Sequence, residues 1–433
     1  MYSSDNATSR RVIMNDTSIH AAAWLLNPDT PPIEHGAILI DSGRIVASGT
    51  LAELKARYAA PVHEHHDCVI LPGFTNAHTH LELTHFPAWR EKNGMGYSPR
   101  GFVDWIIQLI KVTRNLQTED FRSSLVEGLR KCVEAGTTAI GDILSRYELH
   151  PSYTALPVRG RLFFEVLGHD RERFAARLDK ARSCCDSLAG MDIQPGISPH
   201  AAYTCGEGNL PAVRDAASAG SVPLAIHIAE SSIENDFLFD TSGPFAETFY
   251  PFVDWQQYLT PPRRCSATDL FDRHGLLTPA TLAIHCVHVT PADARILKER
   301  GCSICLCPRS NDRLDVGKAP VGLFRKLGIP LALGTDSLAS NDSLSLWDEM
   351  RYALDRYGDD LSPADLLRMA TLGGAAALGL QHEIGSLTPG KRADFQIIAN
   401  CGSDASHLLE RAIGQGRVVD VCIGGNLGSE LPA

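Results

Sequence analysis

The chain has 433 residues, which at roughly 100 to 200 residues per domain allows about two to four domains, or one large barrel with an accessory domain. Its 44% hydrophobic and 21% charged residues are typical of a folded globular protein and exclude a disordered or fibrous one. The 40 Lys and Arg residues face 51 Asp and Glu residues, so the formal net charge of −11 repels phosphate backbones and anionic membrane surfaces. We therefore expect neither nucleic acid nor a membrane as a partner.

The cysteines and the lack of long apolar runs indicate a compartment. No run approaches the roughly 18 uninterrupted apolar residues of a membrane-spanning helix, and residues 1–11 contain no apolar signal core. We therefore expect a cytoplasmic protein whose 12 cysteines are reduced thiols. Cys302 and Cys305 form a C-x-x-C pair, with Cys307 close behind, but a zinc ribbon needs a second ligand pair and none follows. We favour a buried apolar strand, in which free cysteines pack as small hydrophobes.

The predicted elements fall into three regions along the chain. Residues 13–62 contain short runs of alternating polarity separated by Gly and Asp, which predicts β-hairpins. Apolar runs then alternate with amphipathic helical stretches, which predicts a parallel sheet. The expected strands end at residue 78, cover 138–143 and 162–167, end near 198, and cover 223–228, 282–285, 303–307 and 330–333; the expected helices cover 121–134, 173–188, 210–219, 291–300 and 322–327. Residues 393–423 return to the alternating pattern of the first region.

This order predicts the fold class and the domains. Eight strands within about 260 residues match the usual size of a (β/α)8 barrel, so we expect an α/β protein with a TIM barrel over residues 73–383. Because chain termini often lie close together, residues 1–72 and 384–433 are expected to form one small β-sandwich domain. The long connection over residues 231–269, before the sixth strand, is expected to be functional.

Polar side chains follow five of the expected strands, at the end where a barrel builds its active site. They are His78, His80 and Glu82 after the first strand, His200 after the fourth, His227 and Glu230 after the fifth, His285 and His288 after the sixth, and Asp336 after the eighth. In an extended chain His78 and His80 point to the same side, so their two imidazoles can hold one cation. Each motif alone has a plain structural interpretation, but burying so many unpaired polar groups would cost about 1 to 3 kcal/mol each. Together they predict a metal site.

Five motifs also carry a family resemblance. They are Pro-Gly-Phe-Thr-Asn-Ala-His78-Thr-His80, His227-Ile-Ala-Glu230, His285-Cys-Val-His288, Cys307-Pro-Arg-Ser-Asn311 and Gly334-Thr-Asp336-Ser-Leu-Ala-Ser. With them the chain resembles the amidohydrolase superfamily, and within it the cytosine-deaminase-like and chlorohydrolase-like (ATZ/TRZ) branch. The resemblance covers nearly the whole chain, including the C-terminal Gly-Ser-Leu-Thr-Pro-Gly-Lys-Arg-Ala-Asp-Phe segment.

The resemblance implies one divalent metal ion, zinc before iron or manganese, held by His78, His80, His227 and Asp336. A donor set of three imidazoles and a carboxylate suits zinc or ferrous iron better than calcium or magnesium, which prefer oxygen ligands. Members of the superfamily with two metals carry a carboxylated lysine on the fourth strand. The corresponding stretch here, which ends at His200, contains no lysine, so we expect a single ion.

The resemblance also implies catalytic roles. Asp336, with His285 beside it, would take a proton from a water whose pKa the metal lowers toward about 7. Glu230 would protonate a ring nitrogen of the substrate, which requires a carboxyl pKa raised by burial. His285 would stabilise the oxyanion that develops on the attacked carbon.

Five residues are expected to bind substrate: His200, Glu82, Trp105, Arg146 and Asn311. His200 matches a substrate-contacting position in the methylthioadenosine and S-adenosylhomocysteine deaminases, and the stretch at Glu82 resembles that of aminofutalosine deaminases. Residues 101–107, with Trp105, resemble a helix that closes over the nucleoside, although a stripe facing the core gives the same spacing. Arg146, like Arg100 and Arg171, lies where it would clamp a substrate carboxylate, although such arginines are more often solvated.

We therefore expect a metal-dependent hydrolytic deaminase that acts on the adenine ring of a modified purine nucleoside, of the aminofutalosine, S-adenosylhomocysteine or methylthioadenosine type. One alternative is a deaminase or chlorohydrolase of another heterocycle, such as guanine or an s-triazine. Another is an inactive scaffold homologue, which ranks low because every expected ligand is present. Family members often form dimers or larger assemblies, which leaves a homo-oligomer open.

Overall fold

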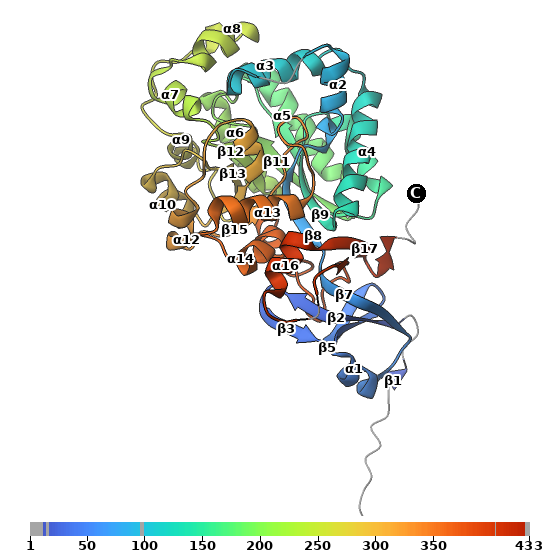
Figure 1. The fold of residues 1–433 in the computed structure, drawn as a ribbon. Helices are drawn as coiled ribbons and strands as arrows, with labels where there is room; N and C mark the ends of the chain where they lie inside the picture. The colour runs from blue at the N-terminus through green and yellow to red at the C-terminus, as the bar shows by residue number, and fades with distance from the viewer. Residues whose placement is uncertain (1–11, 14–16, 96–98, 403, 429–433) are drawn as a thin grey trace, which may run out of the picture. The chain divides into compact units, whose positions relative to one another are not determined.

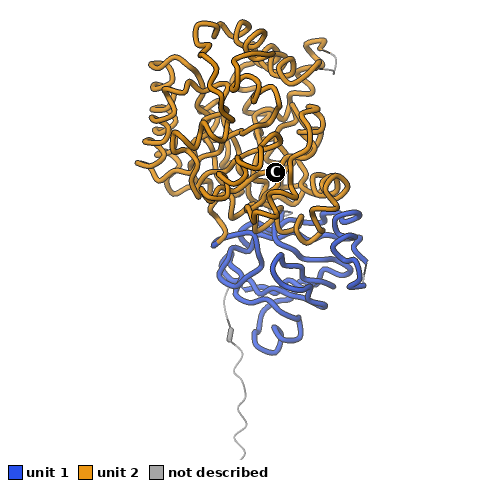
Figure 2. Tube along the Cα trace, turned by 90° about the vertical axis from the view of Figure 1, so that its left-hand side faces the viewer, with its two compact units in different colours: residues 1–73, 382–433 blue, residues 74–381 orange. Residues whose placement is uncertain are grey.

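The computed structural model describes residues 12–13, 17–95, 99–402 and 404–428. The chain divides into two compact units, residues 74–381 and residues 1–73 with 382–433 (Figure 2). Residues 1–11, in which the sequence offers no apolar signal core, lie outside the described residues. Among the residues that are described, no helix combines the length and the apolar character needed to cross a membrane.

Residues 74–381 contain eight parallel strands that pair in chain order (Figure 1). They are β8 (Phe74–Thr79), β9 (Thr137–Leu144), β10 (Arg159–Val166), β11 (Ile193–Pro199), β12 (Leu224–Ile228), β13 (Thr281–His285), β14 (Ser303–Leu306) and β15 (Leu331–Leu333). Most of their residues are buried, as in a parallel sheet covered by helices on its outer face. The predicted (β/α)8 barrel is confirmed.

Helices follow the strands around the barrel. They are α2 (Phe86–Lys92), α3 (Phe102–Thr113), α4 (Thr118–Glu134), α5 (Arg171–Ser187), α6 (Leu210–Gly220), α7 (Ser232–Asp240), α8 (Tyr250–Phe252), α9 (Ala267–Arg273), α10 (Pro291–Glu299), α11 (Pro308–Arg313), α12 (Val321–Leu327), α13 (Leu346–Tyr357), α14 (Pro363–Arg368) and α15 (Gly374–Ala377). The long connection over residues 231–269 is therefore mostly helical: it contains α7, α8 and the start of α9, with helical turns at Phe245–Phe249 and Gln256–Tyr258.

The first and last strands meet at the end that carries the polar side chains. Thr79 forms an isolated parallel bridge with Asp336, whose main-chain nitrogen donates to His78 O at 3.0 Å. Asn76 adds two contacts to Thr335: its Nδ2 donates to Thr335 Oγ1 at 2.8 Å, and its Oδ1 accepts from Thr335 N at 3.0 Å. These bonds fix the C-terminal end of β8 against the loop that follows β15.

The second unit joins both ends of the chain in one sheet, as the fold class predicted. Its elements are β1 (Val12–Ile13), β2 (Thr17–Asn27), β3 (Thr30–Glu34), β4 (Gly36–Asp41), β5 (Arg44–Thr50), α1 (Leu51–Arg57), β6 (Tyr58–Ala59), β7 (Val62–Pro72), β16 (Phe395–Ala399), α16 (Leu408–Gln415), β17 (Arg417–Ile423) and β18 (Asn426–Leu427). The strand order is β18-β17-β16-β7-β2-β4-β5, with β3 paired to β2. Ile70 of β7 pairs with Ile397 of β16, so an N-terminal and a C-terminal strand are direct neighbours.

Two further expectations concern cysteines and charge. Cys302, Cys305 and Cys307 are buried free thiols in and around β14, which confirms the strand interpretation of the C-x-x-C pair.

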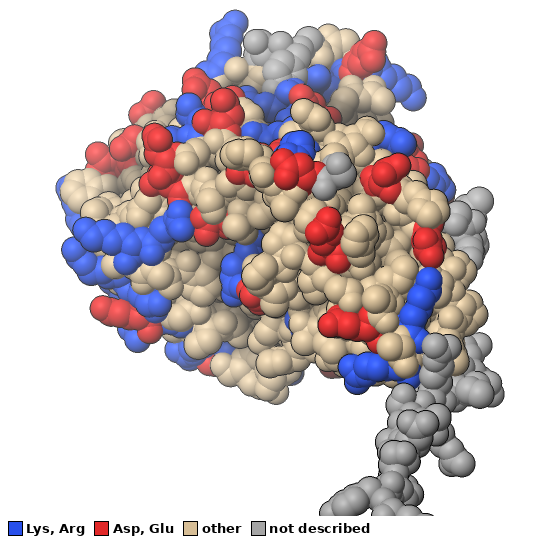
Figure 3. All heavy atoms as spheres, turned by 60° about the horizontal axis from the view of Figure 1, so that its bottom comes forward, with Lys and Arg blue, Asp and Glu red and all other residues tan. Residues whose placement is uncertain are grey.

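On the face that Figure 3 shows, Lys and Arg are interspersed with Asp and Glu and separated by wide uncharged areas. This mixed distribution gives that face no broad basic surface of the kind that binds nucleic acid.

Candidate active site

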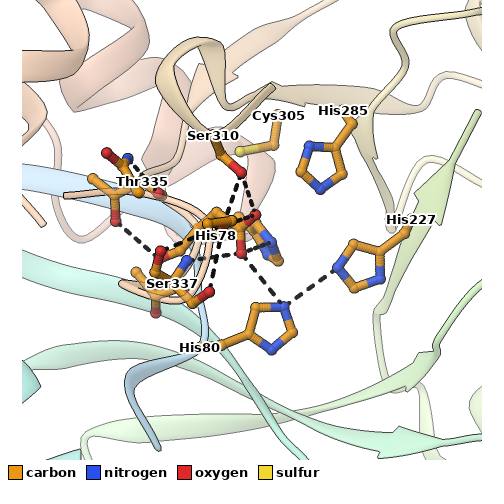
Figure 4. A network of polar contacts seen from close by, with 12 residues as sticks. His78, His80, His227, His285, Cys305, Ser310, Thr335 and Ser337 are labelled. Atoms are coloured by element: carbon orange, nitrogen blue, oxygen red, sulfur yellow. Dashed lines mark hydrogen bonds and ion pairs between the residues drawn. The ribbon is translucent and has the colours of Figure 1, made fainter. Parts of the chain in front are cut away.

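Four imidazoles, which Figure 4 shows, converge with two carboxyls at the C-terminal ends of the barrel strands. They come from His78 and His80 at the end of β8, His227 in β12 with Glu230 just after it, His285 at the end of β13, and Asp336 after β15. The side chains form three overlapping groups in which the ligand atoms lie within 4.8 Å of one another: His78, His227 and His285; His78, His80 and Asp336; and Glu230, His285 and Asp336. The barrel thus brings together the residues that the sequence placed on separate strands.

The histidine side chains of this cluster are not fully hydrogen-bonded by the protein residues described. Both ring nitrogens of His78 are buried and have no hydrogen-bond partner among the described residues. The Nε2 atoms of His80 and His227 face each other at 3.4 Å, and His78 Nε2 lies 3.6 Å from Asp336 Oδ1. Because buried polar groups are normally paired, the unpartnered nitrogens of His78 indicate a ligand at the centre of the cluster. Three imidazoles and a carboxylate fit a divalent metal ion such as zinc.

The protonation states of the cluster favour the same occupant. Burial and the neighbouring His78 lower the pKa of His80 to about 3, and burial with His200 lowers the pKa of His227 well below its usual range. Burial alone would raise the pKa of Asp336, but the imidazoles of His78, His80 and His285 hold it well below its ordinary value. Neutral imidazoles and an ionised carboxylate are the forms that bind a metal.

Hydrogen bonds on the outer side of the cluster orient these ligands. His227 Nδ1 donates to the main-chain oxygen of His200 at 3.0 Å, which turns Nε2 toward the cluster. Asp336 Oδ1 accepts from Ser337 N at 2.8 Å, whereas Oδ2 accepts from the hydroxyls of Ser310 at 2.7 Å and Ser340 at 2.9 Å. The carboxylate is therefore held from behind, with Oδ1 on the side of His78 and His80.

Asp142 of β9 supports the His80 segment in a similar way. Its Oδ1 accepts from Thr79 Oγ1 at 2.6 Å and from Leu81 N at 2.9 Å, and its Oδ2 accepts from Tyr153 Oη. These bonds fix the main chain on both sides of His80. Burial raises the pKa of Asp142 to about 7.

The backbone is strained where the strands end at this site. Ala229, His285, Cys286 and Asp336 have φ values of 50°, 67°, 50° and 58°, in the left-handed region that residues with a side chain seldom occupy. Gly334 allows β8 and β15 to approach closely, since a Cβ atom there would lie 2.7 Å from His78 Cβ. Such strain persists where the surrounding packing over-determines it, and it aims the side chains inward.

Glu230 is placed for proton transfer. Its side chain is buried, and its Oε1 lies 3.5 Å from His285 Nε2. Burial, with Asp336 and Glu234 nearby, raises the pKa of Glu230 well above its ordinary value. His285 Nδ1 contacts Asn311 Oδ1 at 2.9 Å, so in the neutral ring Nε2 carries the lone pair that faces Glu230. The two side chains form a protonated acid beside a neutral base.

A cavity of about 360 Å³ opens over this cluster. Its polar lining comprises His80, Glu82, Thr113, Ser145, Arg146, Glu165, His200, Tyr203, Thr204, His227, Glu230, His285, Asp336 and Ser337. Its apolar lining comes mainly from α3 (Trp105, Ile106, Leu109 and Ile110), from Phe121, and from the long connection (Phe249, Val253 and Trp255). A pocket of this size with an apolar wall and a few convergent polar groups is typical of a small-molecule site.

The cavity includes four of the five residues expected to bind substrate. Glu82, Trp105, Arg146 and His200 line it, whereas Asn311 is absent from its lining and instead holds His285 from behind. The α3 stripe therefore faces the cavity at Trp105, whose Nε1 also donates to Ala339 O at 3.0 Å.

The three arginines considered as carboxylate clamps differ in position. The guanidinium of Arg146 stacks on Phe121 with Cζ 3.7 Å from the ring centroid. Arg100 and Arg171 are exposed and do not line the cavity. Arg146 is therefore the member of this set that can contact an occupant directly.

Sequence reasoning missed Glu165, Glu234, Ser310 and Ser340. Glu165 stands near the end of an apolar strand, so the rule that found the other strand-end carboxylates also applies to it. Glu234 lies on α7, where its Oε2 accepts from Glu230 N at 3.2 Å. The two serines lie inside motifs that carry the family resemblance, but hydroxyl groups are common in loops and only the fold shows that both reach Asp336.

Comparisons with known proteins agree with this geometry. Residues 69–428 match the Amidohydrolase family, which confirms the expected family, and residues 36–60 match the imidazolonepropionase-like composite domain of bacteria. The chain is 31% identical over 372 residues to the 5-methylthioadenosine/S-adenosylhomocysteine deaminase of Desulforudis audaxviator, covering 83% of this chain and 80% of that relative. It is 27% identical over 353 residues to the aminodeoxyfutalosine deaminase of Deinococcus radiodurans, with coverages of 79% and 81%.

A solved structure shows the same fold. An adenosine deaminase from Xanthomonas campestris with bound zinc superimposes with a TM-score of 0.81 at 24% identity, over 98% of this chain and 95% of that one.

Proposed function

The chain belongs to the amidohydrolase family, and from this premise we propose that it is a zinc-dependent aminohydrolase that removes ammonia from the adenine ring of a modified purine nucleoside. The observation that carries the proposal is the pairing of buried Glu230 with His285, at 3.5 Å, beside a cluster that fits one cation. The names of the relatives and the apolar wall of the cavity support a nucleoside as the substrate.

His78, His80, His227 and Asp336 would hold the ion. A divalent metal bound there lowers the pKa of a water toward about 7 and so provides a nucleophile at neutral pH. Zinc fits the donor set best, and iron or manganese are the alternatives to test.

Proton transfer in this proposal belongs to Glu230, Asp336 and His285. Glu230, protonated because of its raised pKa, gives its proton to a ring nitrogen and makes the adjacent carbon electrophilic. Asp336 would accept a water proton, while Ser310 and Ser340 hold its Oδ2. His285 can also take a proton at Nε2, and as an imidazolium it stabilises the oxyanion on the attacked carbon.

The overall reaction forms one C–O bond and breaks one C–N bond. Of the two water protons, one ends on the ring nitrogen and the other on the departing ammonia. Glu82, Trp105, Arg146 and His200 would contact the rest of the nucleoside, and Asn311 would act by holding His285.

The test is ammonia release by protein loaded with zinc, iron or manganese. The panel contains aminofutalosine, S-adenosylhomocysteine, methylthioadenosine, adenosine, guanine and a chloro-triazine. We expect turnover confined to the adenine nucleosides, with Glu230→Gln as a control for contaminating deaminases. Turnover of guanine alone, or chloride release from the triazine, would replace the proposal with another heterocycle hydrolase. No turnover of any compound by metal-loaded protein would refute it.

A further inference from the structure

Glu165 is a buried carboxyl that the proposed chemistry does not use. It lies near the C-terminal end of β10, is 6% exposed and lines the cavity. Its main-chain oxygen accepts from Arg177 Nε at 2.9 Å, but its carboxyl oxygens make no hydrogen bond to any described residue. Burying a carboxyl without a hydrogen-bond donor costs free energy. We therefore expect a ligand to contact the Glu165 carboxyl on the side that faces the cavity.

Its neighbour Glu82 differs in this respect. Glu82 Oε1 accepts from the hydroxyl and the main-chain nitrogen of Ser145, and its Oε2 accepts from Arg146 N at 3.2 Å. Burial raises the pKa of both carboxyls to about 7, and the charge of Glu165 contributes to the shift at Glu82. Both side chains line the same cavity, where Glu82 already has protein donors and Glu165 has none among the described residues.

The barrel order sets these carboxyls apart from the metal cluster. Glu82, Ser145 and His200 follow strands β8, β9 and β11, and Glu165 lies in β10 between the last two. Apart from the β8 histidines, the residues of the metal cluster come from β12, β13 and the loop after β15. Glu165 therefore lies on a strand that contributes no residue to the metal cluster, and an occupant that reacts at the cluster would present another of its parts to Glu165.

We propose that Glu165 determines specificity by accepting a hydrogen bond from a sugar hydroxyl of the substrate, next to Glu82. The proposal rests on the proposed nucleoside deaminase function. A vicinal pair of hydroxyls offers two donors, which matches two neighbouring carboxyls that line one region of the cavity. A cationic group is a weaker match, because Arg177 already places a positive charge near the Glu165 carboxyl and lowers its pKa.

The test is a matrix of enzymes and substrates. Wild type, Glu165→Gln and Glu165→Met are assayed with methylthioadenosine, its 2′-deoxy and 3′-deoxy analogues, and S-adenosylhomocysteine. Removing the recognised hydroxyl should lower kcat/KM of the wild type by about 10- to 100-fold, the loss typical of a hydrogen bond to a charged group. Glu165→Met should lose a similar factor on the full nucleoside but little on that deoxy analogue. Glu165→Gln keeps an oxygen acceptor, so its kcat/KM on the full nucleoside should lie between those of the wild type and Glu165→Met. This variant keeps the test valid if Glu165→Met fails to fold.

Metal content and thermal midpoint are measured for each variant, because Glu165 lies outside the metal cluster and neither should change. An equal loss of kcat/KM on all substrates, or no discrimination against deoxy analogues by the wild type, would overturn the assignment. A loss confined to S-adenosylhomocysteine, which carries an amine, would also overturn it and point to a cation. If the wild type deaminates no nucleoside, the proposed function fails as well; if it deaminates them without this coupling, only the role of Glu165 fails.

Discussion

Ser310 provides a direct test of how the fold prepares Asp336. The Ser310 hydroxyl donates to Asp336 Oδ2 at 2.7 Å, its oxygen lies 2.9 Å from Ser340 Oγ, and both serines are buried. Ser310→Ala removes one donor from a charged acceptor, and such a bond contributes about 1.5 to 3 kcal/mol. Because Ser340 still donates to the same oxygen, we expect the lower end of this range, about a 10-fold weaker zinc affinity. The double variant Ser310→Ala/Ser340→Ala should lose about 100-fold.

The assay is competition for zinc with a chromophoric chelator, which reports the Kd without requiring turnover. Ser198→Ala is the matched control: the Ser198 hydroxyl is also buried, but it has no hydrogen-bond partner in the described part of the chain, so the same atom is removed without loss of a contact to Asp336. We expect its zinc Kd to stay within about twofold of the wild type. Equal Kd values for Ser310→Ala and Ser198→Ala would refute the idea that the serine pair supports the carboxylate.

Three other predictions follow from the same geometry. Glu230→Gln should bind zinc normally and lose about 100- to 10,000-fold in kcat, and retained activity with full metal content would remove Glu230 from proton transfer. Chelation of the metal should lower the thermal midpoint, and zinc at about 100 times its Kd should restore about 2.7 kcal/mol of stability; a midpoint insensitive to zinc would contradict the metal site. Burial, and to a smaller extent the neighbouring His65 and His63, lowers the pKa of His20 from 6.5 to about 3. Between pH 3 and pH 6.5 the unfolded chain therefore binds more protons than the folded one. The contribution of His20 to the free energy of unfolding is complete above about pH 6.5 and is smaller by about 2 kcal/mol at pH 5. Denaturant titrations at pH 7.5 and 5 should show this difference in the wild type, and His20→Leu should reduce it. An unchanged difference in His20→Leu would count against His20.

The sequence was informative about the metal cluster for a topological reason. In a parallel barrel every strand ends on the same rim, so a histidine or carboxylate at the end of a predicted strand must lie near the others whatever the loops do. His78, His80, His227 and Asp336 needed only the assignment of their strands to be placed together. The same reasoning applies to Glu165. Its position near the end of an apolar strand was enough to predict that it lies at the same rim of the barrel.

Contacts that depend on the path of loops could not be predicted from the sequence. Arg100, Arg146 and Arg171 have equivalent sequence contexts, yet Arg146 alone of the three lines the cavity, because its main chain is held by Glu82. Asn311 belongs to a motif expected to contact substrate, but the start of α11 turns it toward His285.

The pattern of apolar runs and strand-end polar groups thus determined the barrel, its shared terminal domain and the residues that fit a cation, since these follow from periodicity and from the common direction of parallel strands. Tertiary structure alone decided which side chains support them. The serines behind Asp336, the left-handed φ at Ala229 and the open carboxyl of Glu165 depend on the distances between segments that are far apart in the chain. Packing sets those distances, and local sequence carries no record of them.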